Sequence, residues 1–245
     1  MKMKKRTKIV PIAVLLLVVA VVAAANVWRS RSQVRNIKVD IVYAGADTLV
    51  TPQQIASLVQ EKYPGMMTSR LRDIDLKAVA QSAASSPFLH NCEAGTSIGG
   101  DVVVHAVQRR PIVRVCRQGE EFYLDDSKYK VPISRIAECD VLVASGNIPE
   151  SGKGLDQVWT LASYLDSHPD LGPLFDQIYR DGKGDLFLTP KLGRHVVQVG
   201  SDQNLDEKFH NLIVLYTKGL PQAGWETYSQ VSVKYRGQVV CTRKK

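Results

Sequence analysis

The chain has 245 residues, of which 32 are Lys or Arg and 24 are Asp or Glu, giving a formal net charge of +8. Nine of the basic residues lie within residues 1–38, which contain no acidic residue, so residues 39–245 carry 23 basic and 24 acidic side chains. This nearly neutral remainder lacks the basic surface that nucleic-acid binding requires, which excludes that class of function.

The N-terminal segment is the first predicted element. Residues 9–27 are apolar apart from Asn26 and contain no charge. At about 1.5 Å per residue they are long enough to cross a bilayer core of about 30 Å. Five of the first eight residues are basic, which favours a cytoplasmic N-terminus. We therefore expect a cytoplasmic tail over residues 1–8, a transmembrane helix over residues 9–28, and export of the rest.

A cleaved secretory signal is the alternative for this segment. The small residues Ala23, Ala24 and Ala25 offer a cleavage site near Ala25 behind a basic leader. The apolar run is longer than the core of an ordinary signal peptide, and Trp28 stands where an interfacial aromatic residue would lie. Both alternatives place the later residues across a membrane.

The next segment alternates two helices with three strands. Residues 37–41 alternate apolar and polar residues, as a half-buried strand does. Thr51 then opens a helix as its N-cap, followed by Pro52 at the first position and Gln54 closing a capping box. A second helix is expected over residues 75–85. Two further strands are expected over the ranges 88–94 and 101–107.

From Arg109 onward the pattern changes to short strands with two helices between them. Turns at Gln118-Gly119 and Asp125-Asp126 indicate hairpins. The predicted helices cover residues 155–167 and 205–218. The predicted strands are 112–117, 121–124, 140–144, 175–180, 185–189, 195–199, 230–235 and 238–242. The fold class is therefore α+β, and its second domain is mainly antiparallel.

The cysteines give no sign of a metal site. Cys92, Cys116, Cys139 and Cys241 are widely spaced, with no C-x-x-C pair and no nearby histidine at a metal-binding interval. In an oxidising compartment up to two disulfides can form, whereas four buried free thiols would give the same sequence. The spacing leaves both alternatives open.

No catalytic constellation is found. Gly152-Lys153-Gly154 lacks the preceding glycine and the Ser or Thr of a phosphate-binding loop. The segment 181–185 lacks the ligand pattern of a calcium loop, so we expect a hairpin turn. We predict no enzyme activity, no cofactor, no metal and no small-molecule substrate. Arg109 and Arg110 are expected to pair with carboxylates and to fix the angle between two domains.

Four short segments carry a resemblance to a known family. They are Gln108 to Val115, Glu121 to Asp125, Pro132-Ile133, and Tyr228 to Tyr235. In order and content they resemble the bacterial FtsQ/DivIB family of cell-division proteins. The chain departs from the family pattern at Gln108, where Glu is usual, at Ser232, where Asp is usual, and at Lys234, where Arg is usual.

The resemblance implies both architecture and function. It implies a POTRA domain over residues 29–108, with the strand order βααββ, and a β domain over residues 109–245. It also implies a non-enzymatic scaffold that links early and late cell-division proteins and, with FtsB and FtsL, helps to control septal peptidoglycan synthesis. The implied location is the inner membrane at the septum, with both domains in the periplasm.

The same resemblance implies where a partner binds. In the family a partner segment adds a strand beside the C-terminal strands, which here points to Val233, Lys234, Tyr235 and Val239. The alternative for Val233 and Val239 is that they face the core. Two other functions compete with the scaffold: an export or assembly chaperone bearing a POTRA domain, and a membrane-anchored cell-wall hydrolase.

Overall fold

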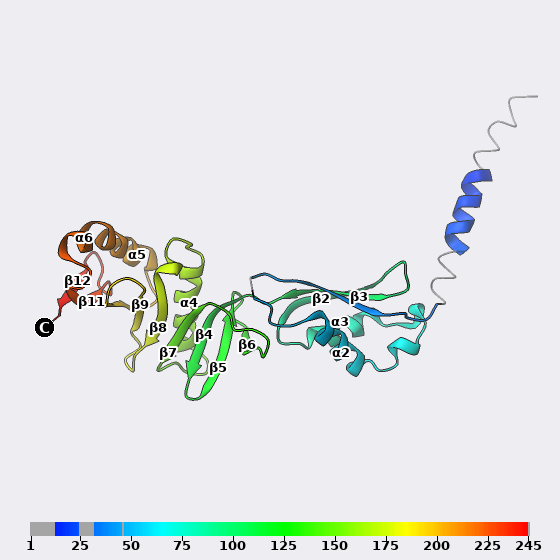
Figure 1. Cartoon of the computed structure of the whole chain (residues 1–245), viewed down its shortest axis with the longest axis horizontal. Helices are drawn as coiled ribbons and strands as arrows, with labels where there is room; N and C mark the ends of the chain where they lie inside the picture. Colours follow the sequence, from blue (N-terminus) through cyan, green and yellow to red (C-terminus); the bar gives the residue numbers. More distant parts are fainter. Residues whose placement is uncertain (1–12, 25–31, 46, 245) are drawn as a thin grey trace, which may run out of the picture. The chain divides into compact units, whose positions relative to one another are not determined.

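The structure is a computed structural model that describes residues 13–24, 32–45 and 47–244. The chain divides into two compact units, residues 1–108 and residues 109–245. Figure 1 shows the helices and strands of each unit with their labels.

The N-terminal segment is described only in part. Residues 13–24 are helical, and their large apolar side chains are exposed, as at Leu17 with 66%. Within the described ranges, no helix has both the length and the apolar character needed to cross a membrane. The remaining residues of the predicted span 9–28, the tail 1–8 and the candidate cleavage site at Ala25 lie outside the described residues.

The first unit consists of a three-stranded sheet with two helices on one face (Figure 1). Its order, strand, helix, helix, strand, strand, is the one expected from the sequence. The sheet order is β1-β3-β2, with β1 parallel and β2 antiparallel to β3. The elements are β1 Ile37–Val42, α2 Pro52–Lys62, α3 Leu76–Ala84, β2 Leu89–Thr96 and β3 Val102–Gln108, with 3₁₀ turns at Met66–Thr68 and Leu71–Asp73.

Local hydrogen bonds explain where these elements begin and end. The predicted capping box is confirmed, because Thr51 Oγ1 accepts from Gln54 N at 3.3 Å and Gln54 Oε1 accepts from Thr51 N at 3.0 Å. Gln108 is 2% exposed and closes the end of β3. Its amide accepts from Leu49 N at 2.7 Å and donates to Asp47 O at 2.8 Å. An ionised Glu in this position could not make the second bond.

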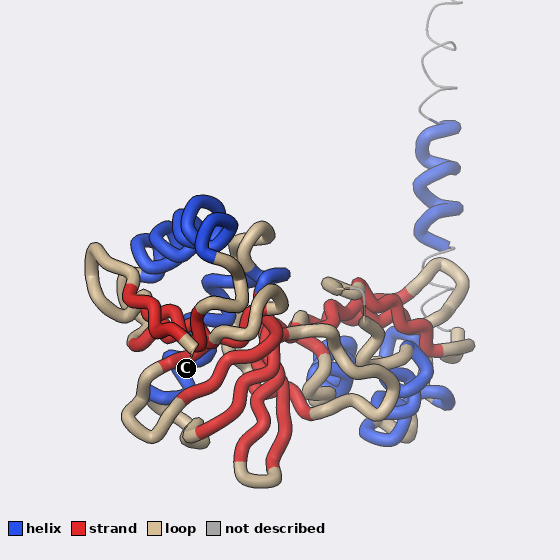
Figure 2. The backbone as a smooth tube through the Cα atoms, turned by 60° about the vertical axis from the view of Figure 1, so that its left-hand side comes forward, coloured by secondary structure: helices blue, strands red, loops and turns tan. Residues whose placement is uncertain are grey.

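The second unit is one nine-stranded sheet with the order β12-β11-β10-β9-β8-β7-β4-β5-β6. Figure 2 shows these strands side by side in red. The strands are β4 Pro111–Arg117, β5 Glu120–Asp125, β6 Lys130–Pro132, β7 Leu142–Gly146, β8 Phe175–Arg180, β9 Leu186–Pro190, β10 Val196–Gly200, β11 Tyr228–Ser232 and β12 Val240–Arg243. The helices are α4 Lys153–Asp166, α5 Leu205–Val214, which continues as a π-helix over Leu215–Gly219, and α6 Leu220–Ala223, with a 3₁₀ turn at Gly172–Leu174.

The α+β fold class is confirmed, but the second unit is more mixed than predicted. Three of its eight strand pairings are parallel: β4 with β7, β7 with β8, and β10 with β11. For two of these pairings the reason lies in the helices, because α4 joins β7 to β8 and the α5–α6 segment joins β10 to β11. A helical crossover returns the chain to run in its original direction, whereas a hairpin reverses it.

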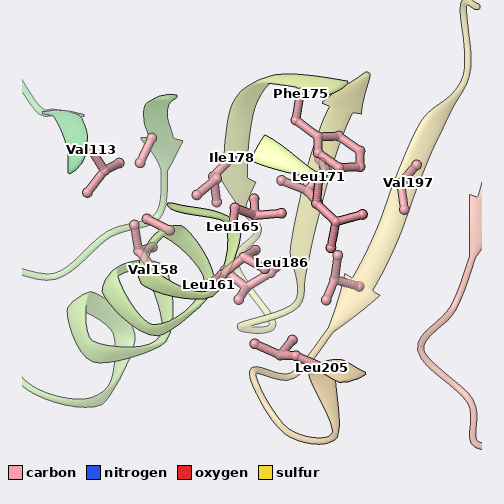
Figure 3. Close-up of a cluster of buried hydrophobic side chains, with 14 of the residues drawn as sticks. Val113, Val158, Leu161, Leu165, Leu171, Phe175, Ile178, Leu186, Val197 and Leu205 are labelled. Atoms are coloured by element: carbon pink, nitrogen blue, oxygen red, sulfur yellow. The ribbon is translucent and has the colours of Figure 1, made fainter. Parts of the chain in front are cut away.

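One hydrophobic core connects the helices of this unit to the sheet. Val158, Leu161 and Leu165 follow the predicted helical spacing in α4 and are fully buried. Figure 3 shows them directed at Ile178 and Leu186 on β8 and β9. The same core includes Phe209 and Leu212 of α5 and Val231 of β11. Burial of these side chains therefore holds the C-terminal strands against the helices.

Candidate protein interaction site

The C-terminal strand β12 forms one end of the nine-stranded sheet. It pairs with β11 in the register Ser232↔Val240, Val231↔Cys241 and Gln230↔Thr242. Among the described residues no strand pairs with its other edge. β12 therefore presents an unpaired row of backbone N–H and C=O groups, which is the feature that strand addition uses.

The direction of each N–H group in β12 follows from one hydrogen bond. Lys244 N donates to Thr227 O at 3.1 Å, on the side of β11. The N–H groups of successive residues in an antiparallel strand point to opposite sides. The N–H group of Thr242 therefore points towards β11, like that of Lys244, and the N–H groups of Cys241 and Arg243 point to the free edge. The side chain of Arg243 is exposed.

The predicted interaction residues lie in the β11–β12 connection, residues 233–239, and not within a strand. The prediction of a strand over 230–235 was wrong at its end, because β11 stops at Ser232. Val233 N still donates to Gln198 O of β10 at 2.9 Å, but its side chain is 2% exposed. The alternative that Val233 faces the core is therefore correct.

Lys234 is held in place by neighbours that are distant in sequence. Its Nζ donates to Asp185 Oδ2 at 2.6 Å, and the same carboxylate oxygen accepts from Gln198 Nε2 at 3.1 Å. The hydrogen bond to Asp185 raises the pKa of Lys234. Gly200 makes room for this side chain, since a Cβ there would lie 2.6 Å from Lys234 Cγ.

Tyr235 and Val239 differ in how much they offer to a partner. Tyr235 is 52% exposed, which leaves its ring accessible in the β11–β12 connection. Val239 is partly buried against the core. The next residue, Val240, is 43% exposed. Accessible apolar surface at this end of the sheet thus comes from Tyr235 and Val240, and Val240 was not singled out from the sequence.

Two hollows flank the β11–β12 connection. One, of about 380 Å³, is lined by Val214, Leu215 and Lys218 of the α5–π-helix segment and by Gln238 and Val239 of the connection. The other, of about 110 Å³, is lined by residues of α5 and by Tyr235. Sequence reasoning missed both, because they form between segments that are distant in the sequence.

The predicted roles of two other segments are confirmed in part. Arg109 Nη1 donates to Asp125 Oδ2 at 2.8 Å, and Arg110 donates to both oxygens of Asp166 at 2.8 and 2.7 Å. Both arginines therefore pair with carboxylates as expected. The segment 181–185 is the expected turn, in which Asp181 Oδ1 accepts from Asp185 N at 2.8 Å.

A family model described as FtsQ/DivIB, C-terminal related, matches residues 110–242, which is more than half of the chain. The chain belongs to this family. The match covers almost the whole second unit, including the β11–β12 connection and β12 as far as Thr242. No curated protein matches the chain.

Membership of the FtsQ/DivIB-related family indicates a role in cell division within a family of non-enzymatic proteins. The described residues include no cluster of three or more His, Cys, Asp or Glu side chains that could hold a metal ion. Cys92, Cys116 and Cys241 are free thiols, so the alternative with two disulfides is wrong. Burial raises the pKa of the Cys92 and Cys241 thiols, which makes them less reactive.

Proposed function

We propose that the chain is a non-enzymatic membrane scaffold of the divisome. In this proposal residues 1–8 are cytoplasmic, residues 9–28 form the anchor in the inner membrane, and a POTRA domain (29–108) and a β domain (109–245) lie in the periplasm at the septum. The chain links early and late division proteins and, with FtsB and FtsL, helps to control septal peptidoglycan synthesis.

The observation that carries the proposal is the free edge of β12, the last strand of the sheet. A partner segment would pair with the outward N–H groups of Cys241 and Arg243. Such main-chain bonds provide affinity, and side chains at alternate positions provide specificity. Family membership supports the cell-division context. The apolar helix over residues 13–24 supports an anchor in that region.

The four predicted residues have different parts in this binding mode. Tyr235 contacts the partner, because an exposed aromatic side chain beside a free edge is the type favoured in interface cores. Lys234 and Val239 flank the partner strand. Val233 contributes indirectly, because its buried side chain packs the β11–β12 connection against the core.

The test compares two variants of one residue, Arg243. Arg243→Pro removes an outward N–H and places a ring in the path of an added strand, while Arg243→Ala removes the side chain and keeps the N–H. The measurement is the affinity of the full-length chain in nanodiscs for purified FtsB. We expect Arg243→Pro to weaken binding by about tenfold or more and Arg243→Ala to bind nearly as well as the wild type. Equal binding by all three proteins would refute strand addition at β12.

A further inference from the structure

The smaller hollow beside the β11–β12 connection is a candidate binding site. Its volume of about 110 Å³ is enough for one small polar group. The walls are mainly cationic and amide side chains from α5 and the connection. They include the cations Lys208, Lys234 and Arg236, the amides Asn204 and Asn211, the ring of Tyr235 and one acidic side chain, Glu207.

Lys208 is the most unusual residue of this hollow. It is 8% exposed, which is rare for a lysine that has no ionic partner. Its Nζ donates to Ser201 O at 2.7 Å, and Ser201 Oγ lies at 3.5 Å. Both oxygens are neutral. No carboxylate oxygen of the described residues lies within 4.0 Å of this ammonium group. Burial, reinforced by Lys234 and opposed by the carboxylates of Asp202 and Asp185, lowers the pKa of Lys208.

The other charges around the hollow are already paired. Lys234 Nζ binds Asp185 at 2.6 Å. Arg236 Nε lies 3.5 Å from Glu207 Oε2, and the other oxygen of Glu207 accepts from Gly237 N at 3.0 Å. Lys208 is therefore the cation of this hollow that forms no ion pair among the described residues, and the carboxylates of Asp202 and Asp185 only partly offset the effect of its burial. A buried charge without a partner is costly, so an anion that enters would be favoured there.

We propose that this hollow binds a carboxylate group and that the group comes from an Asp or Glu side chain of the protein that pairs with β12. The inference rests on the proposed function, because Tyr235 belongs both to the hollow and to the predicted interaction residues. The carboxylate accepts hydrogen bonds from the Lys208 ammonium group, with the side-chain amides of Asn204 and Asn211 as further donors.

The first experiment tests the chemistry with a small probe. The full-length chain, with lysines labelled at Cε, is titrated by NMR in sodium acetate and in sodium chloride of equal ionic strength. We expect acetate to raise the pKa of Lys208 relative to chloride, whereas the Cε signal of the exposed Lys153 should be the same in the two salts. The Cε signal that is absent from the spectrum of the Lys208→Arg variant is assigned to Lys208. An equal response of both lysines to acetate would overturn a carboxylate site at Lys208.

The second experiment tests the source of the carboxylate. Lys208→Met keeps the aliphatic stem but removes the charge, and Lys153→Met, at an exposed lysine of α4, is the matched control. We expect Lys208→Met to weaken FtsB binding by about 30-fold, since truncation of one partner of a buried ion pair costs about 2 kcal/mol or more. Lys208→Arg should retain most of the affinity, which separates loss of charge from loss of folding.

The combined outcomes separate this inference from the proposed function. If Arg243→Pro binds FtsB weakly and Lys208→Met binds it like the wild type, the hollow does not bind a carboxylate of the partner. Strand addition at β12 would still be supported. An acetate response with unchanged FtsB binding would mean that the hollow takes free carboxylates only, which also overturns the proposal. Unchanged binding in both variants would refute the proposed function itself.

Discussion

The two edges of the nine-stranded sheet are built in opposite ways. At one edge β6 has only three residues and ends at Pro132, which lacks an N–H, and Lys130 Nζ lies 4.8 Å from the centre of the Phe122 ring. At the other edge β12 has no proline and exposes Val240. Short strands, lysine and proline are the usual means of blocking an edge. The difference teaches that only the β12 edge is suited to receive a foreign strand.

The two ends also differ in how they are stabilised. Beside β6, the carboxylate of Asp125 is 1% exposed and accepts from Arg109, from Ser127 and from Tyr129 N, while Trp159 Nε1 donates to Asp125 O at 2.9 Å. Beside β12, the described hydrogen bonds of Lys234 and Lys244 are made by partly exposed side chains. One end is therefore fixed by a buried polar network and the other by surface contacts.

The largest expected effect comes from breaking the buried network. Asp125→Ala leaves the Arg109 guanidinium buried without its carboxylate, which should lower the free energy of unfolding by about 3–5 kcal/mol. Asp126→Ala is the control, because the Asp126 side chain is 54% exposed and its loss should cost about 1 kcal/mol or less. Urea unfolding measures both. Similar losses of unfolding free energy for the two variants would contradict a stabilising role for the buried polar network beside β6.

The second-largest expected effect is on the affinity for the partner, with the stability of the fold unchanged. Tyr235→Glu places a charge beside the β12 edge and should weaken FtsB binding by roughly tenfold. Tyr179→Glu is the matched control, because Tyr179 on β8 is 48% exposed, close to the 52% of Tyr235. Affinity and the unfolding midpoint are measured for both. Equal weakening by the two variants would remove Tyr235 from the site.

The smallest expected effect is a dependence of stability on pH near the β12 end. His195 is 2% exposed, and its Nε2 lies 2.8 Å from Tyr216 Oη. Burial, reinforced by Lys244 and opposed by Glu226, lowers the pKa of His195. The unfolded chain then binds more protons, so this contribution to stability is present above about pH 6.5 and is lost as the pH falls below it.

The test of this dependence is the slope of unfolding free energy between pH 7 and pH 5. We expect His195→Gln to reduce that slope. The matched control is His90→Gln, at an exposed histidine, which should keep the wild-type slope. A wild-type slope in His195→Gln would show that the buried imidazole does not link this end of the sheet to pH.

The sequence predicted the elements whose causes are local. The capping box at Thr51 and the apolar spacing of α4 depend on residues within one or two turns, and both are confirmed. Asp75 is the N-cap of α3, at the start predicted for that helix. Such features follow from the hydrogen-bonding and packing needs of a single helix, so no knowledge of the tertiary structure is required.

What the sequence did not predict depends on distant contacts. The strand predicted through Tyr235 ends at Ser232, where the chain turns so that Lys234 reaches Asp185 across Gly200. The parallel pairing of β10 and β11 depends on the crossover through α5. The burial of the Lys208 ammonium group is visible only once Ser201 and the β11–β12 connection are placed beside it.

The blocked β6 edge has a consequence for stoichiometry. Open-ended polymers grow when one surface of a subunit fits a different surface of the next. With Pro132 at one end of the sheet, edge-to-edge growth has only β12 to use, and two copies that joined through it would close as a pair. This sheet can therefore take up one neighbouring strand per molecule and cannot propagate as a filament through its own edges.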